Sequence, residues 1–198
     1  MKSFISFTIL VGLIVGFFSV VSDNLPYMDE NVHLFQIILS YIAIMINSLP
    51  MWFIMAMVVG YLFGKNLKHA VLLGMIYTTV AISFYFIIGY IYEYVAYKNQ
   101  LNALFSFKEQ VNILLVWYGT SLFGGSIGGG AGFLFKKRVS VLWIVIGGLC
   151  LQLYLNGSRS WNDIVGIMQN VTYCFMILGS VYVIIKKRKK LTNSKEGV

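Results

Sequence analysis

Six long apolar segments leave this chain few folds to choose from. A helix needs roughly 20 apolar residues to cross about 30 Å of hydrocarbon. Six stretches meet that requirement, with short connections between them: residues 3–22, 41–64, 70–92, 111–135, 139–157 and 164–185. We therefore predict an all-α polytopic membrane protein with six transmembrane helices in one domain over residues 1–198, ending in a basic tail over 186–198.

Composition supports this prediction. The chain is 59% hydrophobic and 11% charged, whereas a soluble domain has about 25% charged residues. So little charge cannot cover a water-exposed surface, so membrane lipids are expected partners. The net charge of +8 does not indicate nucleic acid, because the basic residues form short blocks beside apolar runs rather than one exposed face.

The basic blocks instead predict an orientation. With the N-terminus inside, only Lys98, Lys108 and Arg159 fall outside, which leaves 12 of the 15 basic residues in the cytoplasm. Short loops rich in Lys and Arg stay on the cytoplasmic side. We predict a multi-pass protein of the cell membrane with both termini in the cytoplasm.

The first segment has two interpretations. Lys2, the apolar run and Ser22 resemble a signal peptide that is cleaved after a small residue. Gly12 and Gly16, at four-residue spacing, suit instead a retained helix that packs against its neighbours. We expect retention.

The second span is interrupted near its middle. Residues 35–64 would make a helix of about 45 Å, which is too long for one simple crossing. Residues 47–50 read Asn-Ser-Leu-Pro, and Asn or Ser is a good N-cap ahead of a proline in the first turn. We expect two pieces, with 33–46 against the outer surface or dipping into it and 50–64 descending to the cytoplasm. A single helix kinked near Asn47 and Pro50 is the alternative.

The fourth span carries ladders of small residues at four-residue spacing, which places each ladder on one helix face. In lipid, such faces allow helix backbones to approach closely. No phosphate-loop motif is present. We predict helix packing through Gly124, Gly128 and Gly132, against either the same chain or a second copy.

Catalytic and metal-binding motifs are missing from the sequence. His33 and His69 fall on opposite predicted sides, and Cys150 and Cys174 lie in separate spans without a C-x-x-C motif. There is no H-E-x-x-H, no G-x-S-x-G and no pair of intramembrane carboxylates. We therefore expect no enzyme, no metal and no cofactor.

Polar residues recur at one depth in the predicted outer half. Counting 1.5 Å per residue from the cytoplasmic ends puts four of them about 20 to 27 Å up their spans, namely Asn47, Tyr85, Gln152 and Gln169. Glu93 and Asn112 come out at the outer rim. We predict that polar residues of this outer layer line one outward-facing pocket with Trp52 and Trp117 as apolar walls, and that Glu93, the only charge, favours neutral or cationic solutes. Solvation of the membrane interface is the alternative. The predicted ligand-binding residues are Tyr85, Glu93, Asn112, Gln152, Asn156 and Gln169.

Several short motifs resemble a known family. They are Asn47-Ser48 before Trp52, the run at 70–74, Trp117 ahead of the glycines and the basic triplet at 136–138. Over about residues 40–155 the chain resembles a family of small bacterial multi-helix membrane proteins of unknown function, although Gln152 stands where an acidic residue is expected. Size and helix number are also similar to the substrate-binding subunits of energy-coupling-factor transporters, which bind a ligand near the outer surface and dock on a cytoplasmic-side partner.

Two functions follow from these patterns. The first is a non-catalytic accessory, assembly or immunity-type membrane protein whose polar residues only join helices. The second is a small-molecule binding or transport component with an outward-facing polar pocket. Expected partners beyond lipid are a small polar solute, another membrane protein or a homo-oligomer. A cavity of at least about 300 Å³ reaching Gln152 and Gln169 would favour the second function, and tight pairing of polar side chains the first.

Overall fold

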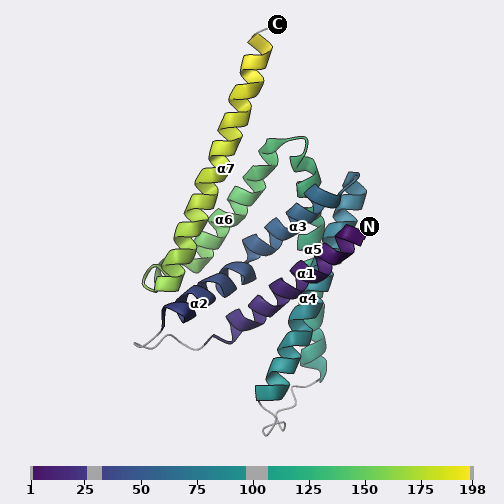
Figure 1. Ribbon diagram of the computed structural model, residues 1–198, viewed down its shortest axis with the longest axis vertical. Coiled ribbons are helices and arrows are strands. Elements are labelled where there is room, and N and C mark those ends of the chain that lie inside the picture. The colour runs from purple at the N-terminus through teal and green to yellow at the C-terminus, as the bar shows by residue number, and fades with distance from the viewer. Residues whose placement is uncertain (1, 26–32, 97–106, 197–198) are drawn as a thin grey trace.

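The computed structural model describes residues 2–25, 33–96 and 107–196, and within these ranges the chain is helical without strands. Figure 1 shows the arrangement. Two short 3-10 turns, η1 (Val139–Val141) and η2 (Ser158–Trp161), flank α6. The helices are α1 (Lys2–Asp23), α2 (Leu34–Asn47), α3 (Leu49–Phe63), α4 (Leu67–Ala96), α5 (Phe107–Phe135), α6 (Leu142–Asn156) and α7 (Ile164–Glu196).

The helices suit a membrane in both length and surface. Five are long and apolar enough to cross one, and the bent pair α2–α3 makes a sixth crossing if it counts as one span. Large apolar side chains are exposed on the surface, for example Leu10 at 62%, Phe123 at 70% and Phe175 at 69%. Such a surface is costly in water and natural in lipid. The predicted all-α, multi-pass fold is confirmed.

The second span is broken where the sequence predicts it. Helices α2 and α3 meet at an angle of 62°, and Ser48 between them has an extended backbone. Ser48 is the N-cap residue of α3, but its hydroxyl donates to the carbonyl of Met45 at 2.7 Å instead of accepting from an N–H of α3. The prediction of side-chain capping was therefore wrong in its chemistry. Helix α2 packs against α1 and α7.

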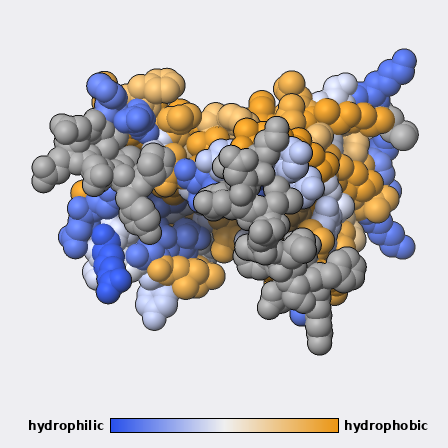
Figure 2. Space-filling view, turned by 90° about the horizontal axis from the view of Figure 1, so that it is seen from below, coloured by the Kyte–Doolittle hydropathy of each residue, from blue (hydrophilic) through white to orange (hydrophobic). Residues whose placement is uncertain are grey.

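The molecule has two distinct ends. One end, which we call the basic end, holds the start of α1, the α3–α4 turn, the α5–η1 turn and the C-terminal part of α7. In Figure 1, α7 reaches the top of the view, and the start of α1 lies near mid-height at the right. The basic end carries Lys65, Lys68, Lys136 and Lys137. Figure 2 views the opposite end, where hydrophilic surface lies at the left and along the right edge, and hydrophobic surface covers much of the coloured part between them.

Helix α5 is wedged between α3 and α4 by its glycines. A β-carbon on Gly128 would lie 2.7 Å from Cβ of Ala56, and one on Gly132 would run into the backbone of α3 at Met57. Gly125 and Gly129 abut the backbone of α4 in the same way. Each predicted ladder thus packs on a different helix of this same chain. Gly124 has no atom within 4 Å of its added β-carbon and takes no part in the packing.

Two apolar cores surround this wedge. One joins α1, α3 and α4, with fully buried Ala56, Val59 and Ala81. The other joins α2, α3, α5, α6 and α7 around Leu149 and Tyr173. At the basic end, the Lys136 ammonium donates to the carbonyl of Gly64 at 3.0 Å and so holds the end of α5 to the end of α3.

Candidate ligand-binding cavity

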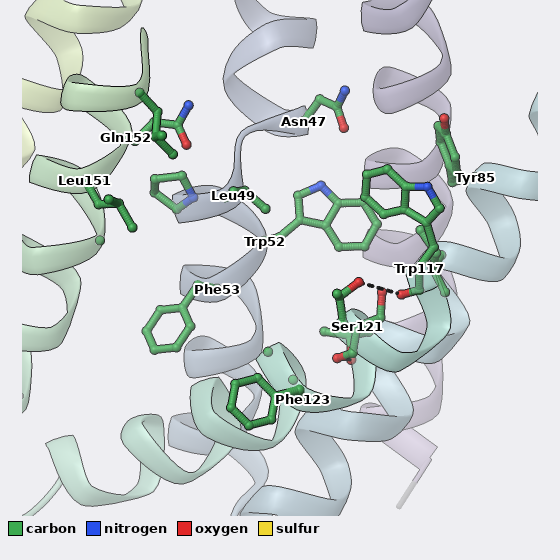
Figure 3. A pocket seen from close by; sticks show the side chains of 18 of the residues that line it. Asn47, Leu49, Trp52, Phe53, Tyr85, Trp117, Ser121, Phe123, Leu151 and Gln152 are labelled. Atoms are coloured by element: carbon green, nitrogen blue, oxygen red, sulfur yellow. Dashed lines mark hydrogen bonds between the residues drawn. The ribbon is translucent and has the colours of Figure 1, made fainter. Parts of the chain in front are cut away.

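A cavity of about 760 Å³ lies between α3, α5 and α6, and it is partly open to the surroundings of the protein. In Figure 3, Leu151 and Gln152 of α6 stand on one side and Trp117, Ser121 and Phe123 of α5 on the other. Helix α3 lies between these walls and contributes Leu49, Pro50, Trp52 and Phe53. The volume falls in the range of small-molecule sites, about 300 to 1,000 Å³.

The cavity is chemically asymmetric along its length. Asn47, Tyr85 and Gln152 lie toward one side of the view in Figure 3, whereas Phe53 and Phe123 lie toward the other. Asp23, the last residue of α1, joins the polar group. The polar part lies toward the end opposite the basic end, and most of the remaining lining is apolar. We call the group of Asp23, Asn47, Tyr85 and Gln152 the polar mouth.

Asp23 organises one side of the polar mouth. The Asn47 amide donates to Oδ1 of Asp23 at 3.0 Å, and the Tyr85 hydroxyl donates to Oδ2 at 2.7 Å. Asp23 and Asn47 are the last residues of α1 and α2, and Tyr85 lies within α4. The carboxylate is therefore held by two neutral donors, one on each oxygen, and it remains an exposed part of the cavity lining.

Hydroxyls deeper in the cavity are already engaged with backbone. Thr78 of α4 donates to the carbonyl of Ser121 in α5 at 2.8 Å. Thr120 donates to the carbonyl of Val116 at 2.9 Å. Because these hydroxyls bond to main-chain carbonyls, they add little polarity to the deeper cavity. Apart from the hydroxyl of Ser121, the lining there is largely apolar.

A polar network joins α6 to α7 on the other side of the mouth. Gln152 donates to Asn156 at 2.9 Å, and Asn156 donates to Asn170 at 2.9 Å. Asn170, which is fully buried, donates to the Ser160 hydroxyl at 2.8 Å. Buried amides need such partners, since an unpaired one costs about 1 to 3 kcal/mol. Gln152 is the one member of this network that also lines the cavity.

The six residues predicted for the site are placed in three different settings. Tyr85 and Gln152 line the cavity, as do the two tryptophans predicted as walls, Trp52 and Trp117. Asn156 and Gln169 lie in the α6–α7 contact, where Gln169 also donates to the Tyr173 hydroxyl at 3.0 Å. Glu93 and Asn112 are exposed and do not line the cavity. The prediction that Glu93 and Asn112 bind a ligand is therefore not supported by this cavity.

The sequence reasoning missed Asp23, which supplies the carboxylate that was expected from Glu93. Asp23 follows directly after the first predicted span, residues 3–22, so the sequence alone places it in a connection. The depth argument could have found it, since the end of span 3–22 lies level with Asn47 and Tyr85. The signal was an acidic residue at the last position of a helix rather than in its interior.

The described part of the chain holds no group of three or more His, Cys, Asp or Glu side chains that could bind a metal ion. Its two free cysteines, Cys150 and Cys174, are exposed and half-buried respectively. Comparisons with protein-family models, curated proteins and solved structures find no match to this chain. The function must therefore be argued from the cavity itself.

Proposed function

We propose that this protein is a non-catalytic membrane protein that binds an amphipathic small molecule in the cavity between α3, α5 and α6. The observation that carries the proposal is a cavity of about 760 Å³ with a polar mouth at one end and apolar walls along the rest. A ligand of matching shape has a polar head and an apolar body.

The balance of polar and apolar lining argues against a small, fully polar solute. Such a solute would leave most of its hydrogen-bonding groups facing Phe53, Phe123, Ile144 and Leu151, and each unpaired group costs free energy when it leaves water. An apolar chain beside the same residues gains about 25 cal/mol for each Å² that it removes from water. The cavity therefore favours an amphiphile over the polar solute expected from the sequence.

The proposed orientation puts the polar mouth on the outside of the cell. The basic end carries the short blocks of Lys and Arg, and such blocks mark the cytoplasmic side in membrane proteins. With this orientation, a ligand reaches the mouth from the outer leaflet or from the outer aqueous phase. Its polar head would then lie near the outer membrane surface.

An accessory or assembly role is the second candidate. The α6–α7 network favours it, because Asn156, Gln169 and Asn170 pair with protein groups rather than with an open cavity. Interhelical bonds of this kind, worth about 0.6 to 2 kcal/mol each, join helices without any ligand. The two candidates separate on one question, which is whether the cavity is filled by a small molecule.

Two neighbouring glycines of α6 give a matched test. Gly148 lines the cavity and Gly147 does not, and an added β-carbon meets no atom within 4 Å at either position. Gly148→Leu should fill part of the cavity, whereas Gly147→Leu adds the same side chain outside it. Each protein is purified from native membranes in a neutral detergent, and bound small molecules are identified by mass spectrometry.

We expect the wild type and Gly147→Leu to retain the same amphiphile, and Gly148→Leu to lose most of it. Equal retention by all three proteins would place the molecule elsewhere on the surface. A wild type that carries no specific amphiphile would remove the proposal and leave the accessory role.

A further inference from the structure

The polar mouth contains a feature that the binding of a neutral amphiphile does not use. Asp23 presents a carboxylate to the cavity, and its two described donors, Asn47 and Tyr85, are uncharged. Neutral donors fix the position of a carboxylate without cancelling its charge. A carboxylate has about four lone-pair sites, so two accepted hydrogen bonds leave it able to accept more.

Aromatic side chains surround the same part of the cavity. Trp52, Tyr85 and Trp117 all line it, from α3, α4 and α5. Figure 3 shows all three on the same side of the cavity as Asn47, whose amide binds Asp23. The face of an aromatic ring attracts a cation, most strongly when the cation is partly removed from water.

Carboxylate and aromatic rings together favour one class of head group. An ammonium gains from the negative charge of Asp23 and from the ring faces, and a quaternary ammonium can use both without donating a hydrogen bond. An anionic head group would meet the like charge of Asp23 and would lose water without compensation. A neutral sugar head group would gain hydrogen bonds but no charge attraction.

We infer that the cavity selects amphiphiles with a positively charged head group, bound by Asp23 and the rings of Trp52, Tyr85 and Trp117. This inference rests on the proposed function and adds the charge class of its ligand. The head group lies in the polar mouth, and the alkyl chain lies along Phe53 and Leu151. The source of the cation is either a free alkylammonium compound or the choline head group of a lipid.

The test compares probes that share a chain length and differ in head group. Full-length protein in a neutral detergent is titrated with dodecyltrimethylammonium, dodecylphosphocholine, dodecyl sulfate and tetramethylammonium, and binding is counted by native mass spectrometry. We expect dodecyltrimethylammonium to bind at least about tenfold more tightly than dodecyl sulfate, because its cation is attracted by Asp23 and by the aromatic ring faces whereas the sulfate is repelled by Asp23. Tetramethylammonium, which has no chain, should bind weakly.

Two carboxylates near the same end supply a matched pair of variants. Asp23→Asn removes the charge from the cavity but keeps a side chain that can hydrogen-bond Asn47 and Tyr85. Glu93→Gln makes the same change at an exposed position outside the cavity lining. Asp23→Asn should weaken dodecyltrimethylammonium binding about tenfold, because it removes the charge attraction, and Glu93→Gln should leave it unchanged. Trp117→Leu, which keeps an apolar wall, should weaken the cation and spare dodecyl maltoside.

The outcomes distinguish a failure of charge selection from a failure of the proposed amphiphile binding. If no dodecyl probe binds, the proposed function fails. If the probes bind equally and Asp23→Asn has no effect, the cavity stands and charge selection is overturned. Dodecylphosphocholine that binds as tightly as dodecyltrimethylammonium, with the same loss in Asp23→Asn, supports a lipid head group as the source. Preference for dodecyltrimethylammonium alone supports a free cationic amphiphile.

Discussion

Two neighbouring parts of the glycine run in α5 carry the same kind of residue and have different roles. Toward the basic end, Gly125, Gly128, Gly129 and Gly132 abut α3 and α4 so closely that a β-carbon would meet their atoms. One residue earlier, a β-carbon added to Gly124 would meet no atom within 4 Å, and this glycine lines the cavity, as Gly125 also does. In the ladder Gly124, Gly128 and Gly132, the first glycine therefore lines the cavity, and the other two pack against α3.

The difference teaches that a small-residue stripe has no single meaning in a membrane helix. Glycine allows close approach only where another helix arrives, and elsewhere on the same face it leaves space. The path of the neighbouring helix decides whether a glycine packs against it or leaves a cavity. Helix α3 stays against α5 beyond Gly128, and toward the other end α3, α5 and α6 surround the cavity.

The largest expected effect tests which end of α5 lies toward the cytoplasm. Labelling of an introduced cysteine from outside the cell should be either complete or absent. In a variant lacking Cys150 and Cys174, a cysteine replaces Ser158 at the opposite end or Asn66 at the basic end, and both positions are exposed. A membrane-impermeant maleimide should label Ser158→Cys in sealed cells and Asn66→Cys only after permeabilisation. The reverse pattern would invert the proposed orientation.

The next largest effect is expected where α5 packs against α3. Gly128→Leu should lower the free energy of unfolding by about 1 to 3 kcal/mol, because the new side chain has to displace α3. Gly124→Leu adds the same side chain to the same ladder but enters the cavity, so its cost should stay within about 0.5 kcal/mol. Thermal unfolding in detergent compares the two. Equal melting temperatures of the two variants would contradict the different roles assigned to Gly124 and Gly128.

A smaller effect is expected in the polar network between α6 and α7, which borders the cavity at Gln152. Asn170→Ala removes a fully buried amide that bonds Asn156 and Ser160, and it should cost about 0.6 to 2 kcal/mol. The control is Asn112→Ala, at an exposed position, where a change within about 0.5 kcal/mol is expected. An Asn170→Ala protein as stable as the control would mean that the network contributes nothing to stability.

The smallest effect is a change of sign along one ladder. Gly124→Ala should stabilise the protein by about 0.5 to 1 kcal/mol, because alanine is the better helix former and its methyl group has room. Gly128→Ala should destabilise it, since the methyl group lies 2.7 Å from Cβ of Ala56. Chemical denaturation in mixed micelles can resolve the two. A shift of the same sign at both positions would contradict the comparison.

Much of the fold could be predicted from the sequence, because membrane spans leave a strong signal in length and hydropathy. The break at residues 47–50 was predicted from a proline and its preceding polar residues, and the structure places it at Ser48. The packing role of Gly128 followed from spacing alone. The failure at Gly124 shows the limit of spacing, since a ladder says which face is small but not how far its partner helix extends.

The site could be predicted less completely, because a helix face does not say whether an amide on it meets a cavity or a partner side chain. Gln152 and Asn156 share a helix face one turn apart, yet Gln152 reaches the cavity while the Asn156 amide donates to Asn170. Glu93 was expected inside the pocket and is exposed outside its lining. A single sequence gives no signal that distinguishes an amide paired with its neighbour from one that faces a ligand.

The network between α6 and α7 has a consequence for the biogenesis of the protein. If each helix entered the lipid alone, Asn156 on one and Gln169 and Asn170 on the other would be left without their partners in hydrocarbon. Entry of both helices together satisfies these amides at once through the contacts that persist in the folded protein. The short connection of residues 157–163 keeps the two helices close during synthesis. Helices α6 and α7 would thus leave the insertion machinery as one hairpin rather than as two successive spans.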